Sequence, residues 1–162
     1  MPVGFQTFSV SDAAQHLTFP VLAFYPATQA PQAHTVGPYS MAVALDAPLA
    51  SGRYPLVVIS HGSGGAPILY RTIAMALAAR GYVVVLLEHH GNNRLDNSLK
   101  GTWQNLQHRP RHVSLTIDHL STHTAYAPYL DLSRIAVIGH SLGAYTALAL
   151  AGGQPWTQAG EA

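Results

Sequence analysis

The feature that most constrains this chain is an apolar strand that runs directly into a Gly-x-Ser-x-Gly turn. Residues 135–138 read Ile-Ala-Val-Ile, residues 139–143 read Gly-His-Ser-Leu-Gly, and an alanine- and leucine-rich stretch follows. This order predicts a strand, a sharp turn and a helix, with Ser141 exposed at the apex as a nucleophile. The turn brings its two ends close together, so the positions two before and two after the serine must lack bulk, and both are glycine. The alternative is a plain strand-to-helix turn.

The composition is that of one globular domain and excludes several functions. The chain has 162 residues, of which 48% are hydrophobic and only 9% charged, with a formal net charge of +1. Such a charge does not attract nucleic acid or an anionic membrane. Because the chain has no cysteine, disulfides, thiolate catalysis and cysteine metal sites are excluded. The N-terminus shows no secretory signal, and the longest apolar run, Tyr82–Leu87, is far short of the ~20 residues of a membrane span. We therefore expect no membrane span and a cytoplasmic location.

Strands and helices alternate along most of the chain. We expect strands over 3–10, 17–25, 54–60, 82–87 and 134–138, a short strand over 41–45, helices over 67–80 and 109–123, and a surface loop over 26–40. This alternation indicates an α/β fold, in which antiparallel N-terminal strands lead into a mostly parallel sheet with helices on both faces. Ligands bind such sheets beyond the carboxyl ends of the strands. Three polar or glycine-rich turns leave those ends: His61–Gly65, Glu88–Asn93 and Gly139–Gly143.

Six segments carry a resemblance to a known family. They are Phe24-Tyr25-Pro26, His61-Gly62-Ser63-Gly64-Gly65, Arg80-Gly81-Tyr82-Val83-Val84, His90-Gly91-Asn92, Arg109-Pro110 and the run from Arg134 to Gly143. Together they resemble the α/β-hydrolases, and within these the dienelactone-hydrolase-like proteins and the group akin to platelet-activating-factor acetylhydrolases. Two departures are visible. Glu88-His89-His90-Gly91 stands where such relatives tend to have Asp-His-Pro-Gly, and His112 stands where they often have an acid.

The motif and the resemblance assign the same roles. Ser141 would attack an ester carbonyl and form an acyl-enzyme that water then hydrolyses. One oxyanion-hole donor is expected to be the backbone N–H of Leu142, the residue after the nucleophile. The resemblance implies that the second donor is the backbone N–H of Ser63, whereas the alternative is a plain turn that needs glycine. No cofactor and no metal are implied, and the expected partner is a small-molecule ester whose identity the sequence does not give.

The catalytic triad is incomplete in this sequence. In α/β-hydrolases the acid and the histidine follow the serine, yet residues 142–162 contain no histidine or aspartate, and their one acid is Glu161. We therefore interpret residues 1–162 as a single α/β-hydrolase domain that is truncated after the nucleophile helix, with its C-terminal part missing. Such a truncation leaves the strand at 135–138 unpaired at a sheet edge, so we also expect self-association.

The ten histidines require an interpretation of their own. Four of them lie in the three predicted turns: His61, His140, His89 and His90. The first two are expected to shape their turns by local packing, and the last two are candidates to face the cleft. Two further pairs have a spacing of four residues: His108 with His112, and His119 with His123. That spacing can bind zinc, but neither pair has the His-Glu-x-x-His form or an evident third ligand, so we prefer surface histidines.

Three functions remain open at this point. The first is a serine ester hydrolase of the dienelactone-hydrolase type, acting on a small or short-acyl ester. The second is a non-catalytic truncated remnant or binding module of the same fold, and the third is a transferase or peptidase on this fold. A fluorophosphonate probe separates the first two, because it labels only an activated serine. Trp103 either covers the mouth of the site or belongs to the core.

Overall fold

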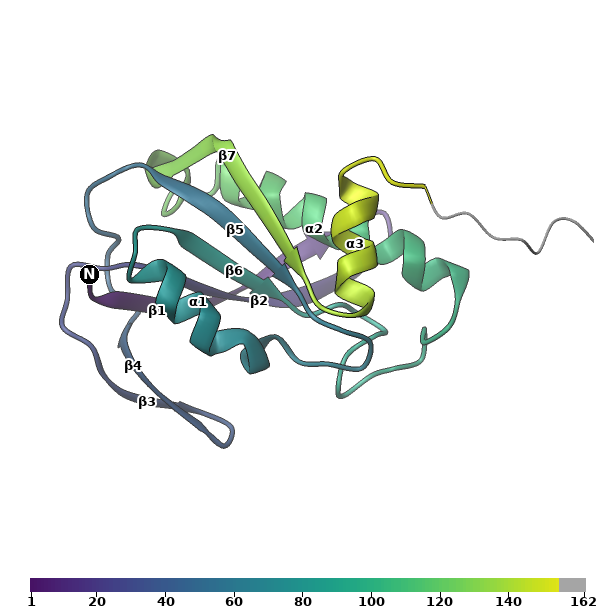
Figure 1. Ribbon diagram of the computed structural model, residues 1–162, viewed down its shortest axis with the longest axis horizontal. Helices are drawn as coiled ribbons and strands as arrows, with labels where there is room; N and C mark the ends of the chain where they lie inside the picture. The colour runs from purple at the N-terminus through teal and green to yellow at the C-terminus, as the bar shows by residue number, and fades with distance from the viewer. Residues whose placement is uncertain (155–162) are drawn as a thin grey trace, which may run out of the picture.

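The structure is a computed structural model that describes residues 1–154, in which seven strands form one sheet that lies between helices (Figure 1). The strands are β1 (Val3–Asp12), β2 (Leu17–Pro26), β3 (Gln32–Val36), β4 (Tyr39–Leu45), β5 (Tyr54–Ser60), β6 (Val83–Leu87) and β7 (Leu130–Gly139). The helices are α1 (Arg71–Ala78), α2 (Trp103–Thr122) and α3 (Leu142–Leu150), with short 3-10 turns at Pro67–Tyr70 and Ala127–Tyr129. The strand order is β3-β4-β1-β2-β6-β5-β7.

The N-terminal half of the sheet is antiparallel except for the short parallel pairing of β1 with β4, and the sheet is parallel where the predicted site lies. β1 pairs antiparallel with β2, and β2 pairs antiparallel with β6, whereas β6, β5 and β7 are parallel to one another. The α/β fold with antiparallel N-terminal strands is therefore confirmed. The surface loop predicted over 26–40 is wrong in part, because β3 lies within it and pairs antiparallel with β4. All five residues of β3 are exposed or half-buried, so this edge strand lacks the apolar alternation that marks a core strand.

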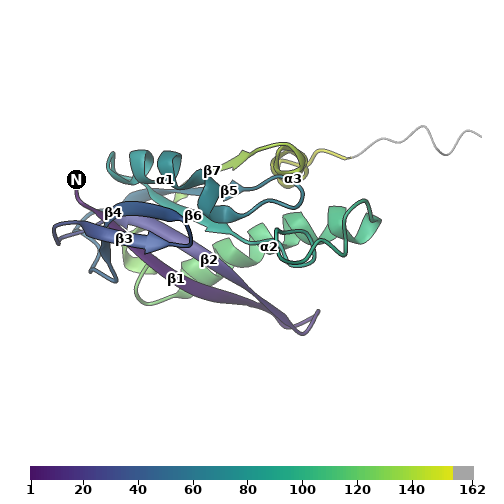
Figure 2. The ribbon, with the colours of Figure 1, turned by 90° about the horizontal axis from the view of Figure 1, so that it is seen from below.

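Helices cover both faces of the sheet, as Figure 2 shows for α1 and α2 on opposite sides of the strands. Successive residues of β6 point to opposite faces and are fully buried. On one face Val84 shares a core with Ala78 of α1. On the other face Val85 shares a core with Val113 and Leu120 of α2. Each fully buried side chain of this size contributes about 1.5–3 kcal/mol, so the central strands hold the turns at their ends firmly in place.

The sequence predicted that this helix begins at Arg109, but α2 begins six residues earlier, at Trp103. Thr102 caps the helix, because its Oγ1 accepts a hydrogen bond from the backbone N–H of Asn105 at 3.2 Å. Such a cap stabilises a helix by about 1 kcal/mol. Pro110 consequently lies inside the helix, although proline normally occupies the first turn. The helix start predicted at Arg109 is therefore wrong, because it relied on the usual position of proline in the first turn.

A hydroxyl from α3 replaces the hydrogen bond that this proline removes. In a regular helix the N–H of residue 110 donates to the carbonyl of Leu106, four residues earlier, but proline has no N–H. The Tyr145 hydroxyl of α3 donates to the Leu106 carbonyl instead, at 3.2 Å. This bond satisfies the carbonyl and joins α3, the helix that follows the predicted nucleophile, to the side of α2 (Figure 1).

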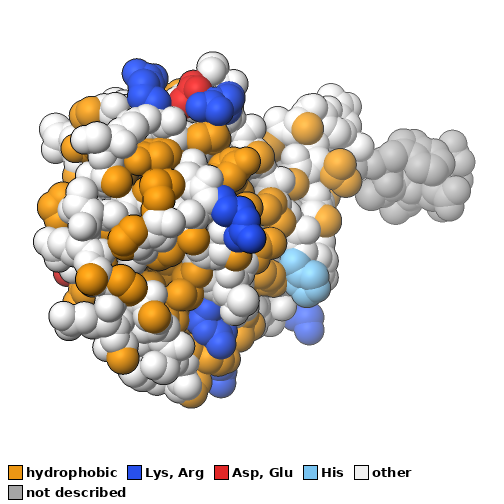
Figure 3. Space-filling view, turned by 60° about the vertical axis from the view of Figure 1, so that its left-hand side comes forward, with side chains coloured by type: hydrophobic (Ala, Val, Ile, Leu, Met, Phe, Trp, Pro, Cys, Tyr) orange, Lys and Arg blue, Asp and Glu red, His pale blue; other side chains and the backbone are white. Residues whose placement is uncertain are grey.

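Strand β7 forms an exposed edge of the described sheet. It pairs with β5 on one side only, and its apolar side chains Leu132, Ile135 and Ile138 are 36–39% exposed. Figure 3 shows one face of the molecule on which hydrophobic side chains form several patches, with lysine and arginine side chains scattered between them.

Among the helices described, none combines the length and the apolar character that crossing a bilayer requires.

Candidate active site

Ser141 lies in the tight turn between β7 and α3, in a backbone conformation that few side chains adopt. Its φ is 54° and its ψ is −120°, and such strain costs about 1–3 kcal/mol. A Cβ on Gly139 would lie 2.0 Å from the carbonyl oxygen of Gly143, and a Cβ on Gly143 would lie 2.0 Å from the carbonyl oxygen of Ser60. The glycine spacing therefore has a steric cause. Ser141 itself is exposed to solvent.

The glycine-rich turn after β5 packs directly against Ser141. A Cβ on Gly62 would lie 3.3 Å from the Cβ of Ser141. The Gly65 N–H donates to the Gly62 carbonyl at 3.1 Å and closes the turn. Among the described residues, the backbone N–H groups of Ser63 and Leu142 make no hydrogen bond to another residue. The structure thus brings together the two segments that carry the predicted oxyanion donors and leaves both donors free.

A tyrosine that precedes α1 links these two turns. The Tyr70 hydroxyl accepts a hydrogen bond from the backbone N–H of Gly62 at 3.4 Å and bonds Nδ1 of His140 at 2.9 Å. The His140 ring is therefore held by Tyr70.

A buried arginine joins two of the predicted turns to α3, the helix that follows the third. Arg109 of α2 is fully buried and donates to the His61 carbonyl. It also donates to Asn92 Oδ1 at 2.7 Å and to Thr146 Oγ1 of α3 at 3.1 Å. Neither ion pair of the described chain involves this guanidinium, and burial lowers its pKa to about 10. A buried charge needs hydrogen-bonded partners, so these neutral acceptors are fixed around it.

Asn92 extends this network to the predicted oxyanion turn. Its Nδ2 donates to Ser63 Oγ at 3.0 Å and to Asn97 Oδ1 at 2.6 Å. Through Asn92, the turn after β6 therefore supports the turn after β5. Sequence reasoning gave no role to Asn92 or Arg109, although both lie in segments that resemble the family. The signal available in the sequence was that Arg109 has helical spacing with the apolar residues Leu106 and Val113.

Three histidines form a buried, neutral chain behind the turns. Burial lowers the pKa of His61 to about 4 and that of His112 to about 3, and it holds the pKa of His89 well below its usual value. The positive charge of Arg109 acts in the same direction on all three pKa values. His61 Nε2 accepts a hydrogen bond from the backbone N–H of His89 at 3.2 Å. His89 bonds Ser60 Oγ at 2.8 Å and His112 Nδ1 at 3.4 Å, so the chain continues into α2.

Two expectations about the histidines are wrong. His89 does not face a cleft, because it is fully buried behind the turns. His112 is not a surface histidine, because α2 turns it into the core, where its ring lies 4.7 Å from that of Phe19. His119 is half-buried and stacks on Phe8 at 5.3 Å. Within the described residues, no group of three or more His, Cys, Asp or Glu side chains is placed to hold a metal ion.

No general base lies beside Ser141 in the part of the chain that the structure describes. His140 is the nearest histidine in sequence, and its ring bonds Tyr70. His61 and His89 are buried and bonded to their own neighbours. Glu161, the acid that follows Ser141 in the sequence, lies outside the described residues. The described site therefore contains the turn of the predicted nucleophile and the candidate oxyanion donors, but no base beside the serine.

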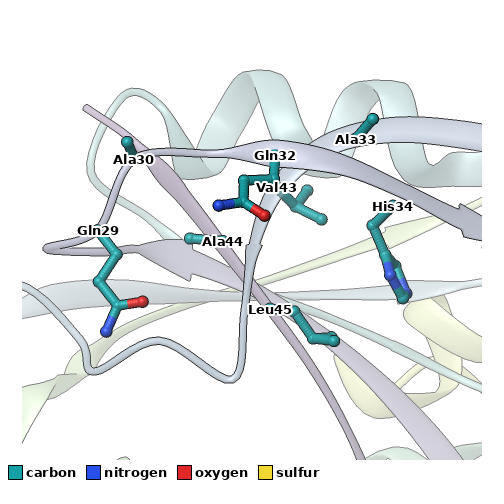
Figure 4. A pocket seen from close by; sticks show the side chains of 8 residues that line it. All are labelled: Gln29, Ala30, Gln32, Ala33, His34, Val43, Ala44 and Leu45. Carbon is teal, nitrogen blue, oxygen red and sulfur yellow. The ribbon is translucent and has the colours of Figure 1, made fainter.

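Two hollows differ in their relation to this site. One, of about 220 Å³, lies between β3 and β4 and is lined by Gln29, Ala30, Gln32, Ala33, His34, Val43, Ala44 and Leu45 (Figure 4). Because β3 and β7 form opposite edges of the sheet, this hollow is remote from Ser141. The other, of about 240 Å³, lies against Leu142 at the beginning of α3.

The comparison with known proteins agrees with this geometry. A sequence profile of the family "Platelet-activating factor acetylhydrolase, isoform II" matches residues 27–108, slightly more than half of the chain. The chain belongs to this family. It is also 42% identical over 45 residues to the platelet-activating factor acetylhydrolase of the dog, a match that covers 27% of this chain and 10% of the canine protein.

Solved hydrolases share the fold of this family member. A ferulic acid esterase from Streptomyces cinnamoneus superposes with a TM-score of 0.79 at 22% identity, over 93% of this chain and 55% of the esterase. A dienelactone hydrolase from Anabaena variabilis superposes with a TM-score of 0.63 at 16% identity, over 93% of this chain and 58% of that enzyme. The α/β-hydrolase fold is thereby shown, and the chain spans little more than half the length of either structure.

Proposed function

We propose that this domain hydrolyses carboxylic esters through an acyl-enzyme on Ser141. The observation that carries the proposal is the strained backbone of Ser141, at φ 54° and ψ −120°, directly beside a glycine-rich turn in which the Ser63 N–H makes no hydrogen bond within the described residues. Strain at a single exposed serine is characteristic of sites where a side chain must be held for chemistry. The family and the esterase-type structures of the same fold support the same reaction class.

The chemistry follows from the placement of these groups. The Ser141 Oγ attacks the ester carbonyl carbon, and the carbonyl oxygen becomes an oxyanion in a tetrahedral intermediate. The backbone N–H groups of Leu142 and Ser63 stabilise that oxyanion, and each such donor is worth about 10²–10³ in rate. The intermediate expels the alcohol and leaves an acyl group on Ser141. Water then attacks the acyl carbon, releasing the acid and restoring the serine.

The base and the acid of this reaction come, in our proposal, from outside the described residues. Two observations support this. The chain spans 55–58% of the two solved hydrolases that it resembles, and β7 exposes Ile135 and Ile138 at an unpaired edge. Further strands added beside β7 would cover that edge and complete the domain, so we propose that residues 1–162 are the N-terminal part of an α/β-hydrolase domain. The expected cytoplasmic location stays a prediction.

Labelling with a fluorophosphonate probe tests the proposed function, with imidazole added as a substitute for the missing base. We expect the 162-residue chain to be labelled at Ser141, at a rate that rises with imidazole concentration. Ser141→Ala should remain unlabelled, and Ser9→Ala, which removes an exposed serine of β1, should behave as the parent. A probe adduct on another residue, or a rate equal in Ser141→Ala and the parent, would refute the proposal and favour a non-catalytic remnant or binding module.

A further inference from the structure

The hollow beside Leu142 lies where the first turn of α2 meets the start of α3. Its lining residues are Gly101, Thr102, Trp103, Asn105, Leu106 and Leu142. Two hydrogen bonds hold the helices that form it, from the Tyr145 hydroxyl to the Leu106 carbonyl and from Arg109 to Thr146 Oγ1. Because Leu142 also carries a proposed oxyanion donor, the hollow borders the proposed active site.

The walls of this hollow are mostly apolar. The Trp103 side chain is 57% exposed, and Leu106 and Leu142 are half-buried. Exposed tryptophan side chains next to a concave apolar surface are typical of binding sites. The volume is about 240 Å³, whereas an apolar cavity of about 150 Å³ already accommodates benzene. One aromatic ring with a small substituent therefore fits.

A single buried amide provides a polar contact in this apolar hollow. Asn105 is 1% exposed, and its Oδ1 has no hydrogen-bond partner among the described residues. Its position is fixed, because its backbone N–H donates to the capping hydroxyl of Thr102 at 3.2 Å. Buried polar atoms are almost always paired, and an unpaired one calls for an explanation. An asparagine amide both donates and accepts, so its natural partner is a group that does the same, such as a hydroxyl.

We propose that this hollow is a substrate subsite for an aromatic ring that bears a hydroxyl group, with the ring against Trp103 and Leu106 and the hydroxyl bonded to Asn105. The assignment of this ring to one side of the scissile ester rests on the proposed function of Ser141. With this assignment, the favoured substrate is an ester of a hydroxyaryl acid or of a hydroxyaryl-substituted alcohol.

Binding of a matched ligand pair tests the subsite without requiring turnover. The protein is the full chain carrying Ser141→Ala, and the probes are 4-ethylphenol and ethylbenzene, which differ only in the hydroxyl. NMR titration follows the indole N–H of Trp103 and the backbone amide of Leu142. We expect both signals to shift with saturation, and 4-ethylphenol to bind about 10-fold more tightly, as one hydrogen bond to a previously unpaired group allows.

Variants separate the amide from the apolar walls. Asn105→Leu should abolish the preference for 4-ethylphenol, while Gln104→Leu, at the neighbouring exposed position, should retain it. Trp103→Ala should weaken both ligands alike. If Asn105→Leu does not fold, the relative affinities of the two ligands and the mapped shifts, both measured on the Ser141→Ala chain, still test the subsite. Equal affinities, or shifts away from α2 and the start of α3, would overturn the subsite.

The two proposals fail in different ways. Hydroxyl-selective binding without probe labelling at Ser141 would refute the ester hydrolase and the assignment of the hollow to an ester. Labelling at Ser141 without selective binding would refute the subsite and leave the hydrolase standing.

Discussion

The buried histidines predict a steep loss of stability in mild acid. An unfolded histidine has a pKa of about 6.5, whereas burial lowers the pKa of His61 to about 4 and that of His112 to about 3. Below about pH 6.5 the unfolded chain therefore binds protons that the folded chain excludes. Since the folded pKa values are the lower ones, this stability is present above the unfolded pKa and is lost as the pH falls.

The size of the effect follows from proton linkage. Each histidine that is protonated only in the unfolded chain contributes about 1.4 kcal/mol per pH unit. Two of them remove about 4 kcal/mol between pH 7 and pH 5, and the lowered pKa of His89 acts in the same direction. Natural domains have a total stability of about 5–15 kcal/mol. The raised pKa of Glu88, caused by its burial, opposes this loss.

Urea unfolding at a series of pH values, followed by far-UV circular dichroism, measures this slope. We predict that His112→Gln flattens it by about 1.4 kcal/mol per pH unit. The control His16→Asn replaces an exposed histidine whose φ of 52° asparagine tolerates, and its slope should match that of the parent. A free energy of unfolding that stays constant from pH 7 to pH 5 would show that these rings are not held neutral.

Three further perturbations test other parts of the structure. Gly139→Ala should destabilise the fold by more than about 3 kcal/mol in thermal melts, because the added Cβ would lie 2.0 Å from the Gly143 carbonyl oxygen. The control Gly37→Ala has open space around it and should cost about 1 kcal/mol. Equal costs for the two variants would contradict the steric argument. Arg109→Met should slow imidazole-assisted labelling of Ser141 by about 10²-fold, since it releases the turn that carries the proposed oxyanion donor of Ser63. An unchanged labelling rate would show that the turn keeps its conformation without Arg109. The parent chain should self-associate in light scattering and Ile135→Lys should reduce this, whereas a monodisperse parent monomer would contradict an open β7 edge.

The sequence was sufficient where one local rule decides the structure. The run at 54–60 is apolar at nearly every position, and β5 is buried on both faces between β6 and β7. The Gly-x-Ser-x-Gly spacing placed the turn between β7 and α3, because only glycine fits where Gly139 and Gly143 approach other backbone atoms. Both features depend on residues close together in the chain.

The sequence was insufficient where distant residues decide the structure. Pro110 suggested a helix start, and only the Tyr145 hydroxyl from α3 makes it acceptable inside α2. The spacing of His108 and His112 suggested a surface pair, because nothing local shows that α2 buries His112 against β2. The role of Arg109 depends on two turns and helix α3, which converge only in the folded protein.

The most direct test of the central claim is to trap the acyl group on the chain. Incubation with p-nitrophenyl acetate and imidazole, followed by peptide mass spectrometry, should find one acetyl group on the peptide that contains Ser141 and none on that peptide in Ser141→Ala. An unmodified Ser141 under conditions that acetylate other side chains would contradict its role as the nucleophile.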